Sequence, residues 1–281
     1  MAIELVTKYL PYVDELFAAE SKKSLLTNTD FDWTGANSIK VYKIGTSAMA
    51  DYDRAGTKSG ATGSRYGTVG NLTASTQQMF VTRDRSFTFV IDKLDSDETG
   101  KTLEAASALA RQLREVVVPE VDSYTYDKMC KGAGTKPAAL TLTAENIYTE
   151  IIKATTTLDD AEVNEAGRVL LVVPEVYQLM KQSKEMVLNT NVGEDMRLKG
   201  VISNLDGMNV IKVSSKRVPE NFGFMIAHPV ATVAPTKLAE YKTHQDPPGI
   251  SGALIEGRIV YDAHVLDNKK MAIYYQENKT A

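Results

Sequence analysis

A long polar stretch between two predicted strands places the strongest constraint on how this chain can fold. It runs from Ser47 to Ser75 as SAMADYDRAGTKSGATGSRYGTVGNLTAS, with glycine at positions 56, 60, 63, 67 and 70 and charges of both signs. Such a stretch offers no large apolar face to a hydrophobic core. It therefore predicts a long loop in solvent or against another molecule.

The segments on either side of this stretch are predicted to be strands. Residues 37–44 (NSIKVYKI) are rich in β-forming side chains, and residues 77–92 (QQMFVTRDRSFTFVID) alternate without a cleanly apolar face. This pattern predicts a two-stranded ribbon that reaches into solvent or along another subunit, with the polar stretch as its tip. Before the ribbon, a short amphipathic helix near residues 11–26 indicates an arm, and Trp33 is interpreted as the anchor that packs it.

The strongest helix signal runs from about Asp97 to Met129 and would be about 50 Å long at 1.5 Å per residue. Acidic side chains gather at its start, as the helix dipole favours. Pro119 is expected to kink the helix because it lacks an N–H group and crowds the preceding turn. The predicted apolar stripe consists of Leu103, Ala106, Ala110, Leu113 and Val117.

Residues 142–245 read as a compact α/β unit. Helices are predicted at residues 144–157 and 174–182, and an unbroken apolar run at residues 168–173 predicts a buried strand. MNVIKV and FGFMIAH read as further strands, and residues 189–207 as a long loop. The chain ends with two alternating strands, LIEGRIVYDAHVLD and KKMAIYYQ, joined by a turn at DNKK.

The bulk properties favour a soluble protein made in a cytoplasm. The 281 residues carry a net charge of −4, which argues against a dedicated nucleic-acid binder. A single cysteine, Cys130, excludes an internal disulfide and is expected to be buried as a small apolar side chain. No signal peptide is recognised at the N-terminus, and no apolar run approaches the roughly 20 residues needed to span a bilayer.

The sequence contains no complete catalytic or cofactor motif. AGTKSG fails the phosphate-loop spacing because Lys58 follows Thr57 rather than glycine. DSDETG begins like a calcium loop, but its twelfth position is Ala106 instead of glutamate. The acidic segment LDDAEVNEAG is interpreted as a solvated turn, with a weak cation site as the alternative. The three histidines are scattered, and there is no GxSxG. We therefore predict no enzymatic activity, no cofactor and no metal.

The order of these parts resembles that of the HK97-fold major capsid proteins of tailed bacteriophages. The final segment GALIEGRIVYDAHVLDNKKMAIYYQ is similar to the end of that family, and FGFMIAHPVATVAPTKLAEYKTH to the segment before it. The resemblance implies an α+β capsid fold divided into an N-terminal arm (1–36), an extended ribbon called the E-loop (37–92), a P-domain with a long spine helix (93–141), a central α/β A-domain (142–248) and closing P-domain strands (249–281).

The resemblance also implies function, partners and contact residues. The chain would assemble with itself, as pentamers and hexamers, into an icosahedral virion shell that encloses DNA without sequence-specific binding. A separate scaffolding protein and a portal protein would be partners, and there would be no membrane partner. The expected inter-subunit contacts at the ribbon tip are Asp51, Asp53, Arg54, Lys58 and Arg65. Those expected in the axial loop are Glu194, Asp195 and Arg197.

Three alternatives stay open at the level of sequence. Some members of the family crosslink a loop lysine to an asparagine of a neighbour, for which Lys58 and Asn268 are the candidates, although no motif positions them. An encapsulin-like compartment that holds a protein cargo is a second alternative, suggested by the amphipathic N-terminal helix. An α/β enzyme with an unrecognised site is the third.

Overall fold

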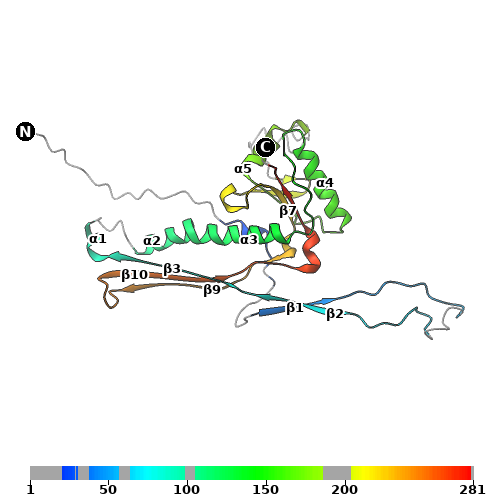
Figure 1. The fold of residues 1–281 in the computed structure, drawn as a ribbon, viewed down its shortest axis with the longest axis horizontal. Helices are drawn as coiled ribbons and strands as arrows, with labels where there is room; N and C mark the ends of the chain where they lie inside the picture. The colour runs from blue at the N-terminus through cyan, green and yellow to red at the C-terminus, as the bar shows by residue number, and fades with distance from the viewer. Residues whose placement is uncertain are drawn as a thin grey trace, which may run out of the picture. The chain divides into compact units, whose positions relative to one another are not determined.

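The computed structural model describes residues 21–28, 30, 38–56, 64–98, 105–185 and 204–279 (Figure 1). The chain divides into two compact units. The ribbon unit is Ala36–Phe80, and the main unit is Met1–Gly35 together with Val81–Ala281. Helices and strands are mixed throughout the main unit, in agreement with the expected α and β content.

The ribbon unit is built on two antiparallel strands. Strand β1 (Ser38–Ile44) pairs with β2 (Ala74–Phe80) in a regular register from Ser38↔Phe80 to Ile44↔Ala74. One further hydrogen bond, from Gly45 N to Thr73 O at 2.8 Å, continues the pairing beyond the strands. The β-branched and aromatic side chains of IKVYKI explain the strand, since they fit a pleated surface. The prediction of a strand at residues 37–44 is confirmed.

The return segment, expected as one long strand over residues 77–92, is instead two strands. Strand β2 ends at Phe80, and β3 (Arg83–Asp92) begins after a break of two residues. Strand β3 pairs with β10 (Gly252–Tyr261), from Arg83↔Tyr261 to Asp92↔Gly252. The expectation was wrong because alternation alone does not reveal that the two halves pair with different partners.

A three-stranded antiparallel sheet, in the order β3-β10-β9, forms one part of the main unit. Strand β9 (Thr236–Gln245) pairs along β10. One face of this sheet packs against helix α2 through Ile91, Ala253 and Ile255 (Figure 1). Strands β9 and β3 were expected outside the closing strands, so the observed pairing crosses the expected boundaries at residues 92 and 248.

The predicted long helix is not α-helical throughout. Helix α1 (Lys93–Glu98) precedes α2 (Ala105–Gln112), which continues through a π-helical turn, η3 (Leu113–Val117), into α3 (Val118–Gly132). In the π turn, Val118 N–H donates to Leu113 O. The wider turn lies directly before Pro119, whose ring would otherwise crowd the carbonyl four residues earlier. The kink itself stays a prediction.

The apolar stripe predicted for this helix is partly wrong. Ala106 and Ala110 are exposed, whereas Ala105, Ala108 and Leu109 face the sheet. In an alanine-rich segment the neighbouring faces are nearly equal in apolar character, so periodicity cannot choose between them. In α3 the chain is buried deeply, and its buried residues are Val121, Asp122, Thr125, Tyr126, Met129 and Cys130.

A five-stranded sheet in the order β12-β7-β4-β6-β5 forms the α/β part of the main unit. Strand β4 (Val169–Val172) is wholly buried between β7 (Phe222–Ala227), antiparallel to it, and β6 (Met208–Lys212), parallel to it. The short β5 (Asn204–Leu205) closes one edge, and β12 (Ile273–Glu277) lies outside β7. Helix α5 (Pro174–Gln182) follows β4. The predicted strands at MNVIKV and FGFMIAH and the helix at residues 174–182 are confirmed.

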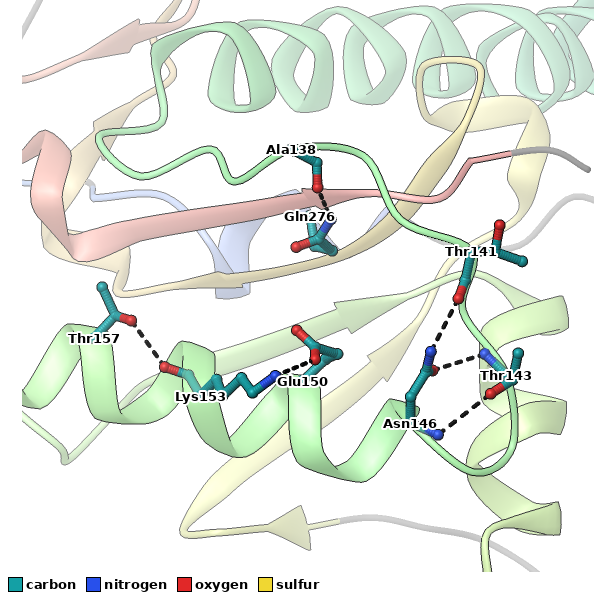
Figure 2. Close-up of polar contacts among 8 residues, drawn as sticks. All are labelled: Ala138, Thr141, Thr143, Asn146, Glu150, Lys153, Thr157 and Gln276. Carbon is teal, nitrogen blue, oxygen red and sulfur yellow. Dashed lines mark hydrogen bonds and ion pairs between the residues drawn. The ribbon is translucent and has the colours of Figure 1, made fainter.

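Helix α4 (Ile147–Asp160) begins with a reciprocal cap, which Figure 2 shows. Thr143 N–H donates to Asn146 Oδ1 at 2.8 Å, and Asn146 N–H donates to Thr143 Oγ1 at 3.3 Å. The reciprocal pair has the form of a capping box, built on the turn that leads into the helix, with Asn146 directly before the first helical residue. The apolar face of the helix then enters the core through Ile147, Ile151, Ala154 and Leu158.

The segment between α3 and α4 covers the outer edge of β12. Thr135 and Leu140 form isolated parallel bridges to Tyr274 and Asn278. Gln276 donates from Nε2 to Ala138 O at 3.0 Å (Figure 2). This edge is thereby closed to pairing with other chains.

The closing strands belong to different sheets. Strand β10 lies in the three-stranded sheet and β12 in the five-stranded sheet. Between them lie β11 (His264–Val265), which pairs with β8 (Thr232–Val233), and the 3-10 helix η6 (Asp267–Ala272) at the predicted turn. Two further 3-10 turns are η4 (Ser215–Arg217) and η5 (Pro229–Ala231). Within the described stretches, no helix is both long and apolar enough to cross a bilayer.

Candidate assembly surface

The tip of the ribbon unit is held together by backbone and aromatic contacts. Asp53 N–H donates to Arg65 O at 2.9 Å, which joins the two sides of the tip. The rings of Tyr52 and Tyr66 meet edge to face with their centroids 5.0 Å apart. Gly56 has φ of 72°, in the left-handed region that glycine adopts at little cost. These contacts hold together the two sides of the described part of the polar stretch.

The charged residues expected at this tip are only partly described. Asp51, Arg54 and Arg65 are exposed, and Asp53 is half-buried. Lys58 lies outside the described residues, as do Glu194, Asp195 and Arg197 in the expected axial loop and Trp33 in the arm. The expectation that these residues contact other subunits therefore stays a prediction.

Exposed apolar side chains gather on the ribbon unit, and sequence reasoning missed them. Of the thirteen large apolar side chains that are exposed in the described part of the chain, eight belong to this unit, although it is by far the smaller one. They are Tyr42, Ile44, Met49, Tyr52, Tyr66, Val69, Leu72 and Phe80. The signal was present in the sequence as isolated aromatic and aliphatic residues within a polar context, but their exposure needs the structure.

The exposed face of strand β1 is the most regular part of this surface. Tyr42 is 73% exposed and Ile44 is 66% exposed, and both lie on the same side of the strand as Lys40. A two-stranded ribbon with one such face uncovered is at best marginally stable in water. The exposed face of β1 is therefore a candidate contact surface for another protein molecule.

A buried ion pair joins η4 to helix α3, and the base of the N-terminal arm hydrogen-bonds to the same carboxylate. Arg217 Nη1 lies 2.8 Å from Asp122 Oδ2, and the Asp122 side chain is 1% exposed. Ser21 donates its hydroxyl to the other carboxylate oxygen at 2.6 Å. Burial lowers the pKa of Lys23, and the nearby charge of Asp122 opposes this shift. The segment continues through the fully buried Leu26.

The acidic segment at the end of α4 is paired with an arginine that directly follows it. The buried Arg168 forms an ion pair with Asp159 at 2.6 Å, and its guanidinium donates to Asn164 O at 3.0 Å and to Val163 O. Arginine thus satisfies the carbonyls and the carboxylate that a bound cation would use. No group of three potential metal-ligating side chains is found in the described parts of the chain.

Two features of the main unit bear on catalysis, the single cysteine and a hollow at one end of the five-stranded sheet. Burial raises the pKa of the Cys130 thiol to about 12, which confirms the predicted buried cysteine and makes a reactive thiolate unfavourable. In open α/β sheets, ligands bind at the carboxyl ends of parallel strands. The corresponding hollow beside β4 and β6, about 490 Å³, is lined by Thr141, Glu175, Ser215 and Asn221 among others, and by none of the described histidines.

Comparison with known proteins identifies the fold. No protein-family model matches the chain, and no curated protein sequence matches it significantly. Among solved structures, a chain of the capsid of the cyanophage P-SCSP1u matches with a TM-score of 0.77 and 13% identity, over 98% of this chain and 93% of that chain. A chain of the mature capsid of bacteriophage PhiM1 matches with a TM-score of 0.75 and 12% identity, over 98% and 92%.

A third solved structure is also similar to the chain over nearly its whole length. A chain of the capsid of Myoviridae phage XM1 has a TM-score of 0.66 and 13% identity, over 97% of both chains. These similarities extend from end to end, while the identities are too low for sequence to carry the comparison. The chain therefore has the fold of the protein chains in these phage capsids.

Proposed function

We propose that this chain is the major capsid protein of a tailed bacteriophage and assembles with copies of itself into the shell around the phage DNA. The observation that carries the proposal is the fold match to phage capsid chains over 98% of this chain. Its location would be the virion, after synthesis in the host cytoplasm. Its role would be structural, without catalysis or a cofactor.

In this proposal, the ribbon unit acts as the E-loop of the HK97 fold. The helix α2–η3–α3 acts as the spine helix, and the sheet β3-β10-β9 beside it completes the P-domain. The five-stranded sheet with α4 and α5 forms the A-domain, and the loop with Glu194, Asp195 and Arg197 lies towards the capsomer centre. Relative to the sequence-based boundaries, β3 and β9 join the P-domain because both pair with β10.

The apolar surface of the ribbon unit supports assembly with a second copy. Fully burying a side chain the size of leucine or phenylalanine contributes about 1.5–3 kcal/mol. Tyr42 and Ile44 together would therefore strengthen each contact by about 3 kcal/mol or more, roughly a hundredfold in association. A subunit in a shell meets several neighbours at once, so modest contacts of this kind add to a stable whole.

Charge and backbone freedom fit the same role. The net charge of −4 suits a shell that retains DNA by confinement, because tight phosphate binding needs many cations. Gly56 and Gly67, both with positive φ, give the tip backbone angles that other residues adopt only with strain. Copies of the chain whose neighbours are arranged slightly differently can then make the same contact through the ribbon tip. The partners proposed with this function are further copies of the chain, assembled as pentamers and hexamers, together with a scaffolding protein and a portal protein.

The proposal is tested by expressing the chain alone and with a candidate scaffold, followed by sedimentation and negative-stain imaging. We expect closed particles. Only monomers of ordinary globular size under every condition would overturn the proposal, and copurification of an enzyme cargo would favour a protein compartment instead.

Two variants connect assembly to the ribbon. Deletion of residues 53–70 and the double substitution Tyr42→Ser, Ile44→Ser should both abolish particles while the subunit stays folded and soluble. Lys40→Ser is the matched control, since it removes an exposed polar side chain from the same face of β1. Normal particles from the double variant would show that this face is not an interface.

A further inference from the structure

A buried carboxylate lies where the ribbon unit joins the main unit along the chain. Asp262 follows the last residue of β10 and is 2% exposed. Its Oδ2 accepts hydrogen bonds from Thr82 N at 2.9 Å and from Thr82 Oγ1 at 2.7 Å. Its Oδ1 accepts from the Tyr124 hydroxyl at 2.9 Å and from Ala263 N at 2.8 Å. Each carboxylate oxygen thus accepts two hydrogen bonds.

Three of these bonds join segments of the main unit that are distant in sequence, and the Ala263 bond is local. Thr82 lies between the end of β2 at Phe80 and the start of β3 at Arg83, Tyr124 belongs to α3, and Asp262 directly follows β10. The backbone N–H of Asp262 donates to Pro235 O at 3.2 Å, next to the start of β9. The second residue after the ribbon unit is therefore tied to the sheet and to the long helix at once.

Hydrogen bonds favour the ionised form of the Asp262 carboxylate, and three basic side chains lie in the same region. Arg83 lies over the ring of Tyr124, with its guanidinium carbon 4.7 Å from the ring centroid, and Lys128 lies over the same ring at 5.4 Å. His264 Nε2 is 3.9 Å from Asp262 Oδ1. Burial opposes ionisation, but the hydrogen bonds from Thr82, Ala263 and Tyr124 outweigh it and lower the pKa of Asp262.

We propose that Asp262 is a positioning residue that anchors the base of the ribbon unit by holding Thr82 against helix α3 and the end of β10. Two of the four hydrogen bonds go to Thr82, a residue that lies in no strand and has no ladder partner to fix it. The anchor fixes the chain within the main unit, two residues after the last residue of the ribbon unit. In a shell, the anchor would fix the base of the ribbon unit in the same way in every subunit. This consequence rests on the proposed function.

Hydrogen–deuterium exchange of the unassembled full-length subunit tests the anchor directly, because the Thr82 amide is one of the bonded groups. Asp262→Asn keeps the shape but turns an NH₂ group towards two donors. We expect exchange over residues 81–86 to rise by roughly tenfold or more, as for a buried donor that loses its acceptor. Exchange in β4 and β7 should not change. The control is Asp127→Asn, which neutralises a half-buried carboxylate on α3, the helix that carries Tyr124.

Two milder variants keep the proposal falsifiable if Asp262→Asn does not fold. Thr82→Val and Tyr124→Phe each remove one hydroxyl and keep the side-chain volume. Both should raise exchange over residues 81–86, and their effects should be non-additive because they share one carboxylate. Unchanged exchange at residues 81–86, or an equal rise there and in β4 and β7, would overturn the anchor and leave Asp262 a general core residue.

Particle imaging of the same variants separates the anchor from the proposed function. If wild-type protein forms particles, we expect Thr82→Val and Tyr124→Phe to form fewer or irregular ones, although the exposed face of β1 is intact. Uniform particles in normal yield, despite raised exchange at residues 81–86, would overturn the role of the anchor in assembly. If the wild type forms no particles, the proposed function fails while the exchange experiment still decides the anchor.

Discussion

Breaking the buried ion pair between η4 and helix α3 should be among the most destabilising single changes in this protein. Arg217→Met keeps an unbranched apolar stem, although a shorter one, and removes the charge 2.8 Å from Asp122. The carboxylate, 1% exposed, would then keep the Ser21 hydroxyl as a hydrogen-bond donor. Removing one partner of a buried pair typically costs about 3–5 kcal/mol. Because Ser21 and the nearby Lys23 compensate in part, we expect about 3 kcal/mol.

This loss converts into a measurable change in melting temperature. For large domains, 1 kcal/mol shifts Tm by roughly 2–4 °C, so Arg217→Met should melt about 6–12 °C below the wild type. Differential scanning fluorimetry of the unassembled subunit measures the shift, and urea titration gives the free energy of unfolding. The matched control is Lys131→Met, which breaks the exposed ion pair with Asp127. That pair is worth at most about 0.5 kcal/mol.

A double substitution checks the reasoning. In Asp122→Leu, Arg217→Met both partners of the ion pair are removed together, so the double variant should be more stable than Arg217→Met. A Tm for Arg217→Met no lower than that for Lys131→Met would refute the argument that the buried charge needs its partner. So would strictly additive effects of the two substitutions.

Three further predictions concern other parts of the main unit. A Cβ added at Gly257 would lie 2.3 Å from ring carbons of Phe87, so Gly257→Ala should destabilise the fold by about 1–3 kcal/mol in thermal melts. Gly70→Ala is the control and should not destabilise the fold, because a Cβ there would have nothing within 4 Å. Cys130 should not react with a thiol reagent at pH 8 in the native protein, because burial raises its pKa to about 12. It should react once urea unfolds the protein, and rapid labelling of the native protein would contradict its burial. Since the folded pKa of Asp262 is lowered, its carboxylate stabilises the fold above its ordinary pKa and loses this contribution as the pH falls through the lowered value. Urea midpoints of the wild type should therefore fall more steeply than those of Asp262→Asn below about pH 4, and parallel pH profiles would contradict this.

Local elements were the part of the fold most accessible from sequence. The unbroken run at residues 168–173 was correctly predicted as a buried strand, and Pro174 correctly marked the start of a helix. Both signals are contained within a few neighbouring residues, through burial and the fixed φ of proline. The polar stretch between two strands likewise indicated a ribbon tip, and Gly56 adopts the backbone angle that only its residue type adopts easily.

Strand partners and surfaces were decided by the tertiary structure. The alternation of residues 77–92 is the same on both sides of Thr82, yet β2 pairs with β1 and β3 pairs with β10, some 160 residues away in the chain. No local pattern contains that information, because cross-strand packing depends on side chains distant in sequence. The carboxylate of Asp262 finds Thr82 and Tyr124 for the same reason.

The sequence by itself determined several local elements, among them β4 and the start of α5, because these follow from periodicity, propensity and backbone sterics over short distances. It also determined that a polar, glycine-rich stretch stays outside the core. Only the tertiary structure decided which apolar side chains are left uncovered, among them Tyr42 and Ile44, and which polar groups meet in the interior. Exposure and buried hydrogen bonding are properties of the packed chain, since each depends on what distant segments bring to the same place.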